Sequence, residues 1–204
     1  MTLDPRRRDL IVVGGSAGAL GALGDLLSVV QPDLPAAIVA TVHMSPQYDS
    51  QLVRLLRGRT RLPVSAATAG LPVKAGHVYV SVPDHHLFLT DAVLQLNRGP
   101  KEHFTRPAVD VLFRSAAMVY GPRAVGILLS GGGYDGTLGM LAIKAAGGVA
   151  LVQDPESTPY ATMLRSAINR VSVDAVVSVR DIAATLSRLA SGEDPPLRRQ
   201  RSAR

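Results

Sequence analysis

Short apolar runs alternate with helix-like segments at both ends of the chain, and this alternation is what most restricts the fold. Leu10–Gly14 and Ala36–His43 have the length and character of buried strands, and Ala19–Val30 and Asp49–Arg57 after them are typical of helices. Further on, strands and helices are expected in turn at Ala124–Ser130, Asp135–Ala146, Val149–Gln153, Thr162–Asn169, Ala175–Val179 and Asp181–Ala190. Such alternation predicts an α/β fold with a doubly wound, mostly parallel sheet and helices on both faces.

The middle of the chain departs from this pattern. It holds four short strand-like runs, at Val64–Ala67, His77–Val82, Leu87–Thr90 and Val93–Asn97. Asp91-Ala92 separates the last two and predicts the tight turn of a small antiparallel hairpin. Arg106-Pro107 then opens a helix that is expected to run to about Tyr120, with Pro107 at its first position.

The length of 204 residues suits one domain with a real core. We assign that domain to residues 10–190, with a flexible segment at 1–9 before it and a flexible basic tail at 191–204 after it. No run approaches the roughly 20 apolar residues that span a bilayer, so we expect no membrane insertion and a cytoplasmic protein. The net charge of +6 allows contact with nucleic acid, but aromatic residues do not interleave with the basic ones, so no nucleic acid partner is predicted.

Gly14 to Gly18 match the pattern G-x-S-x-G directly after the first predicted strand. A serine on a sharp strand-to-helix turn exposes its oxygen, and the glycines let the backbone bend, so Ser16 is a candidate nucleophile. The amide of Ala17 would then face an oxyanion. The alternative is a small serine that caps a helix in a glycine turn. A dinucleotide-binding loop is disfavoured, because no frame through Gly14 to Gly21 gives G-x-G-x-x-G, and a phosphate-binding loop is disfavoured, because Gly-Lys-Ser/Thr does not occur in the chain.

His43 and Asp135 are the candidate partners of this serine. His43 ends the second strand, and Asp135 follows three glycines after the strand that begins at Ala124. In an open parallel sheet these strand ends meet at one edge, where ligands bind. Each residue also has a plain interpretation: His43 as a hydrogen-bonded histidine, and Asp135 as the N-cap of the helix that follows it.

The other histidines show no metal-binding spacing, and the chain has no cysteine, so neither a metal nor a thiol nucleophile is expected. A basic loop carries Arg98, Lys101, His103 and Arg106. It is either a solvated rim, which we favour, or a surface for an acidic partner.

Five segments together resemble the catalytic domain of chemotaxis receptor methylesterases of the CheB type. In order, they are Ile11–Gly18, Val42–Pro46, Gly76–Val80, Arg106–Phe113 and Leu129–Gly136. Several segments in one order are far more specific than a single motif. The family usually has Met at the position of Gly132 and often Thr at that of Ala17.

The resemblance, which covers about Leu10 to Leu189, implies a serine hydrolase that removes methyl esters from glutamyl side chains of receptors, with glutamine deamidation as a second activity. It implies a Ser16, His43 and Asp135 triad, an oxyanion site at the backbone of Ala17 and Gly132, and no cofactor. The expected partners are methylated receptor helices and either a receptor methyltransferase or a separate response regulator. Because nine residues precede the first strand, we expect a stand-alone catalytic domain without a receiver domain.

Two alternatives stay open. A triad does not define the acyl group, so the chain could be an esterase or amidase for another substrate. It could also be a non-catalytic signalling module that binds receptors or a methyltransferase. This alternative remains because Gly132 stands where the family usually has Met.

Overall fold

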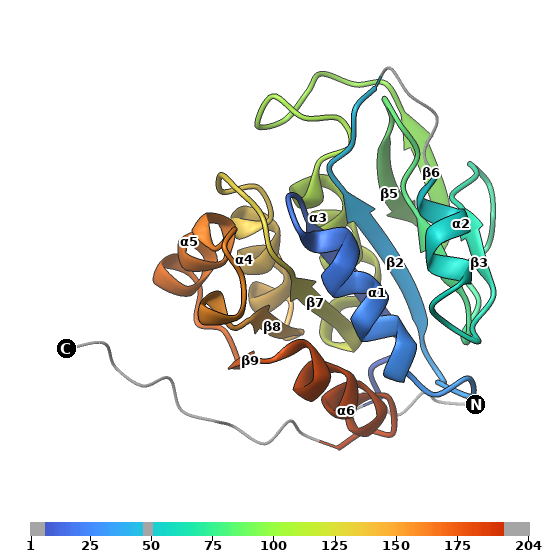
Figure 1. Cartoon of the computed structure of the whole chain (residues 1–204). Helices are drawn as coiled ribbons and strands as arrows, with labels where there is room; N and C mark the ends of the chain where they lie inside the picture. The colour runs from blue at the N-terminus through green and yellow to red at the C-terminus, as the bar shows by residue number, and fades with distance from the viewer. Residues whose placement is uncertain (1–6, 47–50, 194–204) are drawn as a thin grey trace.

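The computed structural model describes residues 7–46 and 51–193, which form a sheet with helices on both sides (Figure 1). The seven strands of the sheet are all parallel, in the order β3-β4-β2-β1-β7-β8-β9. Their bounds are β1 Leu10–Gly15, β2 Ala37–Val42, β3 Val64–Ala66, β4 Val78–Val80, β7 Ala124–Leu128, β8 Val149–Gln153 and β9 Ala175–Val177. The predicted doubly wound α/β fold is confirmed.

Two apolar cores lie on the two faces of this sheet. The helices are α1 Ala19–Val29, α2 Leu52–Arg57, α3 Val109–Tyr120, α4 Thr137–Ala145, α5 Thr162–Arg170 and α6 Val179–Ala190. Side chains of α1, α2 and α6 pack in one core, and those of α3, α4 and α5 pack in the other. Among the described residues, no helix is long and apolar enough to cross a bilayer.

The predicted hairpin is formed by β5 His86–Thr90 and β6 Val93–Asn97, which pair antiparallel outside the main sheet. Asp91 and Ala92 both have positive φ, at 50° and 60°. This is the backbone that a two-residue hairpin turn requires. Leu87, Leu89 and Leu94 of the hairpin join the core on the α3 side of the sheet.

The topology places a switch point at β1. This strand lies between β2 and β7, from which the chain extends to opposite edges of the sheet. Gly15 pairs with Val42, so the residues that follow β1 and β2 leave the sheet at the same level. In folds of this class, ligands bind beyond the carboxyl ends of the strands at such a point.

Helix starts differ from the sequence predictions in several places. The helix predicted from Pro107 begins at Val109, after an extended Ala108, and the Arg106–Pro107 peptide bond is cis. The last helix begins at Val179, two residues early, where the Ser178 hydroxyl accepts a hydrogen bond from the Asp181 amide. The expected start of the second helix at Asp49 lies outside the described residues.

Candidate active site

Ser16 lies in a tight turn between β1 and α1. Its amide donates to the carbonyl of Ser130 at 2.9 Å, and its carbonyl accepts from the Ala19 amide at 3.0 Å. Gly18 completes the turn with φ of 79°, in the left-handed region. The backbone is therefore held from both sides, while the Ser16 hydroxyl makes no hydrogen bond to any described residue.

His43 follows β2 at the same edge, next to this turn. Its amide donates to the carbonyl of Gly15 at 3.0 Å, which ties it to the residue before Ser16. Its Nε2 lies 2.7 Å from Oδ2 of Asp135. A carboxylate can only accept, so Nε2 carries the proton, and Nδ1 keeps its lone pair with no hydrogen-bond partner among the described residues.

Asp135 does not cap its own helix, so that interpretation is wrong. The N-cap of α4 is Gly136, which has φ of 93°. The Asp135 carboxylate instead caps α3: Oδ2 accepts from the Val109 amide at 2.7 Å, and Oδ1 from the Asp110 amide at 2.9 Å. Two otherwise unpaired amides of a helix start thus fix the carboxylate in place. They also explain why α3 begins at Val109.

The charge of Asp135 is stabilised although its side chain is only 2% exposed. Burial alone would raise the pKa of this carboxyl. The hydrogen bonds from His43 and from the amides of Asp110 and Val109 outweigh burial, so the pKa of Asp135 lies below its ordinary value. The group is consequently an anion that can hold and stabilise an imidazolium.

The glycine loop after β7 passes close to the serine. A Cβ at Gly131 would lie 2.8 Å from Cβ of Ser16, so a side chain there would clash. A Cβ at Gly132 would meet nothing within 4 Å. The amide of Gly131 is used by the carbonyl of Tyr160, whereas the amides of Ala17 and Gly132 donate to no described residue. Two free backbone donors therefore remain in the loops around Ser16.

A second histidine–aspartate pair adjoins the first, and sequence reasoning missed it. Nε2 of His103 lies 2.7 Å from Oδ2 of Asp110 and 3.9 Å from Oδ1 of Asp135. Oδ1 of Asp110 accepts from the Gly139 amide at 2.6 Å. Burial raises the pKa of Asp110. The hydrogen bond from the Gly139 amide lowers this pKa, and the nearby charge of Asp135 raises it further. We favoured the interpretation of the basic loop as a solvated rim. That interpretation is wrong for His103, which pairs with the buried Asp110, and for Arg106, which pairs with Asp84.

Among the described residues, one group could hold a metal ion. It consists of His103, Asp110 and Asp135, whose ligand atoms lie within 4.8 Å of one another. Both carboxylates are buried, and each of their four oxygens already accepts a hydrogen bond from an amide or a histidine. We therefore describe the cluster as two hydrogen-bonded pairs and assign no metal to it.

The family comparison matches this architecture. A family model described as CheB methylesterase matches residues 11–186, and that span includes both histidine–aspartate pairs. The chain belongs to the CheB methylesterase family. The catalytic domain of the CheB methylesterase of Thermotoga maritima superposes with a TM-score of 0.84 at 30% identity, covering 89% of this chain and 98% of that one.

Two relatives show the same similarity at the level of sequence. One from Leptospira interrogans is 36% identical over 182 residues, which are 89% of this chain and 94% of the relative. One from Anaeromyxobacter dehalogenans, named protein-glutamate methylesterase/protein-glutamine glutaminase 2, is 37% identical over 183 residues. The match covers 90% of this chain and 54% of that relative.

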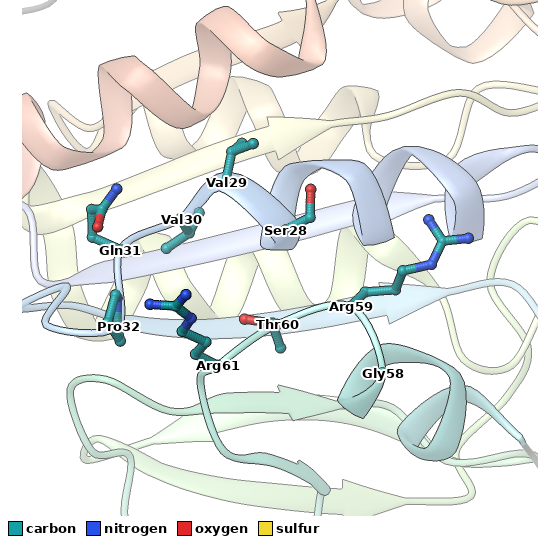
Figure 2. A pocket seen from close by; sticks show the side chains of 9 residues that line it. All are labelled: Ser28, Val29, Val30, Gln31, Pro32, Gly58, Arg59, Thr60 and Arg61. Atoms are coloured by element: carbon teal, nitrogen blue, oxygen red, sulfur yellow. The ribbon is translucent and has the colours of Figure 1, made fainter.

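A separate hollow of about 430 Å³ lies at the far end of α1 (Figure 2). Ser28 to Pro32 at the end of this helix and Gly58 to Arg61 after α2 line it. Ser16 precedes the opposite end of the same helix, so this hollow is remote from the carboxyl edge of the sheet. It contains none of the candidate catalytic residues and is not the site described above.

Proposed function

We propose that this chain is a serine hydrolase that removes methyl esters from glutamyl side chains of chemotaxis receptors and, by the same chemistry, deamidates glutamine. The observation that carries the proposal is the His43 imidazole, which follows β2 next to the turn of Ser16: Asp135 holds its Nε2, and its Nδ1 has no hydrogen-bond partner in the described part of the chain. Family membership supplies the substrate class, since relatives carry the names of both activities.

In the first half of the reaction, Nδ1 of His43 takes the proton of the Ser16 hydroxyl as its oxygen attacks the ester carbonyl. The Nε2–H bond to Asp135 fixes the tautomer that leaves Nδ1 basic. The carboxylate stays ionised and stabilises the imidazolium. The imidazolium then gives its proton to the methoxy oxygen of the intermediate, which leaves as methanol, or to the amide nitrogen of glutamine, which leaves as ammonia.

The amides of Ala17 and Gly132 are the proposed donors to the oxyanion of the tetrahedral intermediate, since neither donates to any residue that the structure describes. Fixed donors of this kind lower the barrier without reorganisation. In the second half, His43 takes a proton from water, and the hydroxide attacks the glutamyl–serine ester. The carboxylate product leaves, and Ser16 regains its proton. We propose no cofactor for any step.

The partners we propose are the methylated cytoplasmic helices of receptors, which place the enzyme in the cytoplasm. A receptor methyltransferase or a separate response regulator is proposed as a further partner.

The test is the release of methanol from a methylated receptor fragment. Replacing the nucleophile, Ser16→Ala, should lower turnover by about 10³ or more. Ser28→Ala is a matched control, because the hydroxyl of this exposed serine at the end of α1 bonds, among the described residues, only to the Asp25 carbonyl. Near-normal turnover in Ser16→Ala would refute the serine mechanism, and inactive wild-type protein would favour a non-catalytic receptor-binding role.

A further inference from the structure

A strained turn lies against the proposed catalytic histidine. Glu102 and Thr105 exchange two backbone hydrogen bonds, at 3.2 and 2.9 Å, so that His103 and Phe104 form a two-residue turn between them. Both central residues have positive φ, 52° and 63°. Glycine or asparagine normally occupies such positions, since the left-handed backbone is costly for bulky side chains.

Long-range contacts hold this turn in place on both sides. Glu102 makes two hydrogen bonds to Nη2 of Arg114 on α3, at 2.7 and 2.9 Å. His103 is held by the buried Asp110 on the same helix. The turn thus keeps a strained backbone in one position, and strain of this kind persists at sites where function uses it.

The turn carries an exposed aromatic ring next in sequence to a residue that lies close to His43. Phe104 is 92% exposed, although Oγ1 of its neighbour Thr105 lies 3.5 Å from Nε2 of His43. The ring of Tyr134, itself 56% exposed, packs edge-on against His103 with centroids 4.9 Å apart. Leu138 continues this apolar surface at 54% exposure. Exposed apolar side chains grouped in this way mark interaction surfaces.

A small cavity and unpaired cations complete the surface. The cavity, about 310 Å³, is lined by His103, Tyr134, Thr137, Leu138, Ser166 and Arg170. Arg170 bonds to the Ser166 hydroxyl, and neither it nor the exposed Lys101 has an acidic partner among the described residues. Asp110 and Asp135 are buried, Glu102 pairs with Arg114, and Asp84 pairs with Arg106 and Arg98. This part of the molecule therefore combines exposed apolar side chains with two cations, Lys101 and Arg170, that have no acidic partner among the described residues.

We propose that the turn at Glu102–Thr105 is the docking element for the protein substrate, and that Phe104 anchors the receptor segment that carries the ester. The inference rests on the function proposed above. The turn adjoins His43, so a second copy of the chain bound there would block the site, whereas the substrate has to come to it. Positive charge around an apolar anchor fits an acidic, amphipathic segment that presents an apolar side chain next to its glutamyl ester.

The variant Phe104→Gly tests this assignment. Glycine accepts a φ of 63° without strain, so the variant removes the ring and keeps the turn. Met118→Ala is the matched control, because Met118 is 87% exposed near the other end of α3. For each protein, kcat/KM is measured on a methylated receptor fragment and on p-nitrophenyl acetate. Binding of the same fragment is measured in a Ser16→Ala background.

For Phe104→Gly, the ratio of receptor to small-ester kcat/KM should fall about tenfold, and the receptor Kd should rise about tenfold, as for an interface anchor. The melting temperature should stay level or rise, and Met118→Ala should keep the ratio within about twofold. An unchanged ratio, an equal loss on both esters, a lower melting temperature or no change in Kd would overturn the proposal. The binding arm separates it from the proposed function, because it needs no turnover.

Discussion

Two histidine–aspartate pairs lie side by side in this structure and have the same geometry at first sight. His43 bonds to Asp135 and His103 to Asp110, in each case through Nε2 and Oδ2 at 2.7 Å. The two aspartates are joined, because the Asp110 amide donates to Asp135. Distance within a pair therefore does not distinguish a catalytic pair from a structural one.

The surroundings of the pairs differ. Asp135 receives two backbone amides as well as His43, and its pKa lies below the ordinary value, whereas burial raises the pKa of Asp110. His43 leaves a sheet strand next to Ser16, and His103 lies on a strained turn. We therefore propose that the pair of His43 and Asp135 serves the nucleophile, because it lies at a strand end next to Ser16 and its carboxylate accepts from two backbone amides.

The largest expected effect comes from removing the charge of each aspartate in turn. Asp135→Asn should lower turnover on a methylated receptor fragment by about 10⁴, because the amide neither stabilises the imidazolium nor selects the required tautomer. It should also lower the free energy of unfolding by at least about 1 kcal/mol, since its NH₂ group would face an α3 amide that then lacks an acceptor. Asp110→Asn should lower turnover by less than about tenfold, because the tautomer of His43 is untouched. Equal losses of turnover in the two variants would show that the two pairs do not differ in their role.

A smaller effect should follow from moving the serine relative to the first pair. Gly131→Ala places a methyl group 2.8 Å from Cβ of Ser16 and should lower turnover by about 10², as misplacement of about an ångström does. Gly21→Ala adds the same methyl group to open space on α1 and serves as the control. Turnover would be measured on the receptor fragment, with the melting temperature followed in parallel. Wild-type turnover in Gly131→Ala would show that the position of Ser16 is not critical.

The smallest effects concern stability against pH, and they should have opposite signs. The lowered pKa of Asp135 stabilises the fold above the unfolded-state value of about 3.9, and this contribution is lost as pH falls through the folded pKa. The raised pKa of Asp110 acts in reverse: the fold loses stability as pH rises from about 3.9 through the folded value. Urea unfolding between pH 3 and 7 would measure both against the Asn variants. As pH falls, the difference in free energy of unfolding between wild type and Asp135→Asn should shrink. Over the same range, wild type should become more stable relative to Asp110→Asn. The same sign for both would contradict the pKa assignment.

Much of the fold was predictable because local patterns determine it. Buried strands such as Leu10–Gly14 are apolar throughout, and their alternation with helices leaves few topologies. The sequence also predicted that Ser16, His43 and Asp135 lie at one edge of the sheet, since each follows a strand and parallel strands end at the same edge. Helix starts were predicted less accurately. Pro107 was expected to open α3, but the helix begins two residues later, at Val109, whose amide donates to Asp135.

The second pair had no signal in the sequence. His103 lies in a turn and Asp110 on α3, so no single helix or strand spans the seven positions between them, and no periodicity could indicate the pair. The role of Asp135 as the cap of α3 depends on a contact between residues 25 and 26 positions apart. The sequence offered capping of the following helix only as the alternative role of Asp135, because local capping is the common case.

We propose that Ser16 is activated by the pair of His43 and Asp135 and not by the pair of His103 and Asp110. A fluorophosphonate probe reacts with an activated serine, so its rate of labelling and its site measure this activation directly by mass spectrometry. We predict one labelled residue, Ser16, with labelling lost in Ser16→Ala, slowed by about 10³ or more in His43→Gln, and changed by less than about tenfold in His103→Gln. No labelling of the folded wild-type protein, or equal rates in wild type and His43→Gln, would contradict the account.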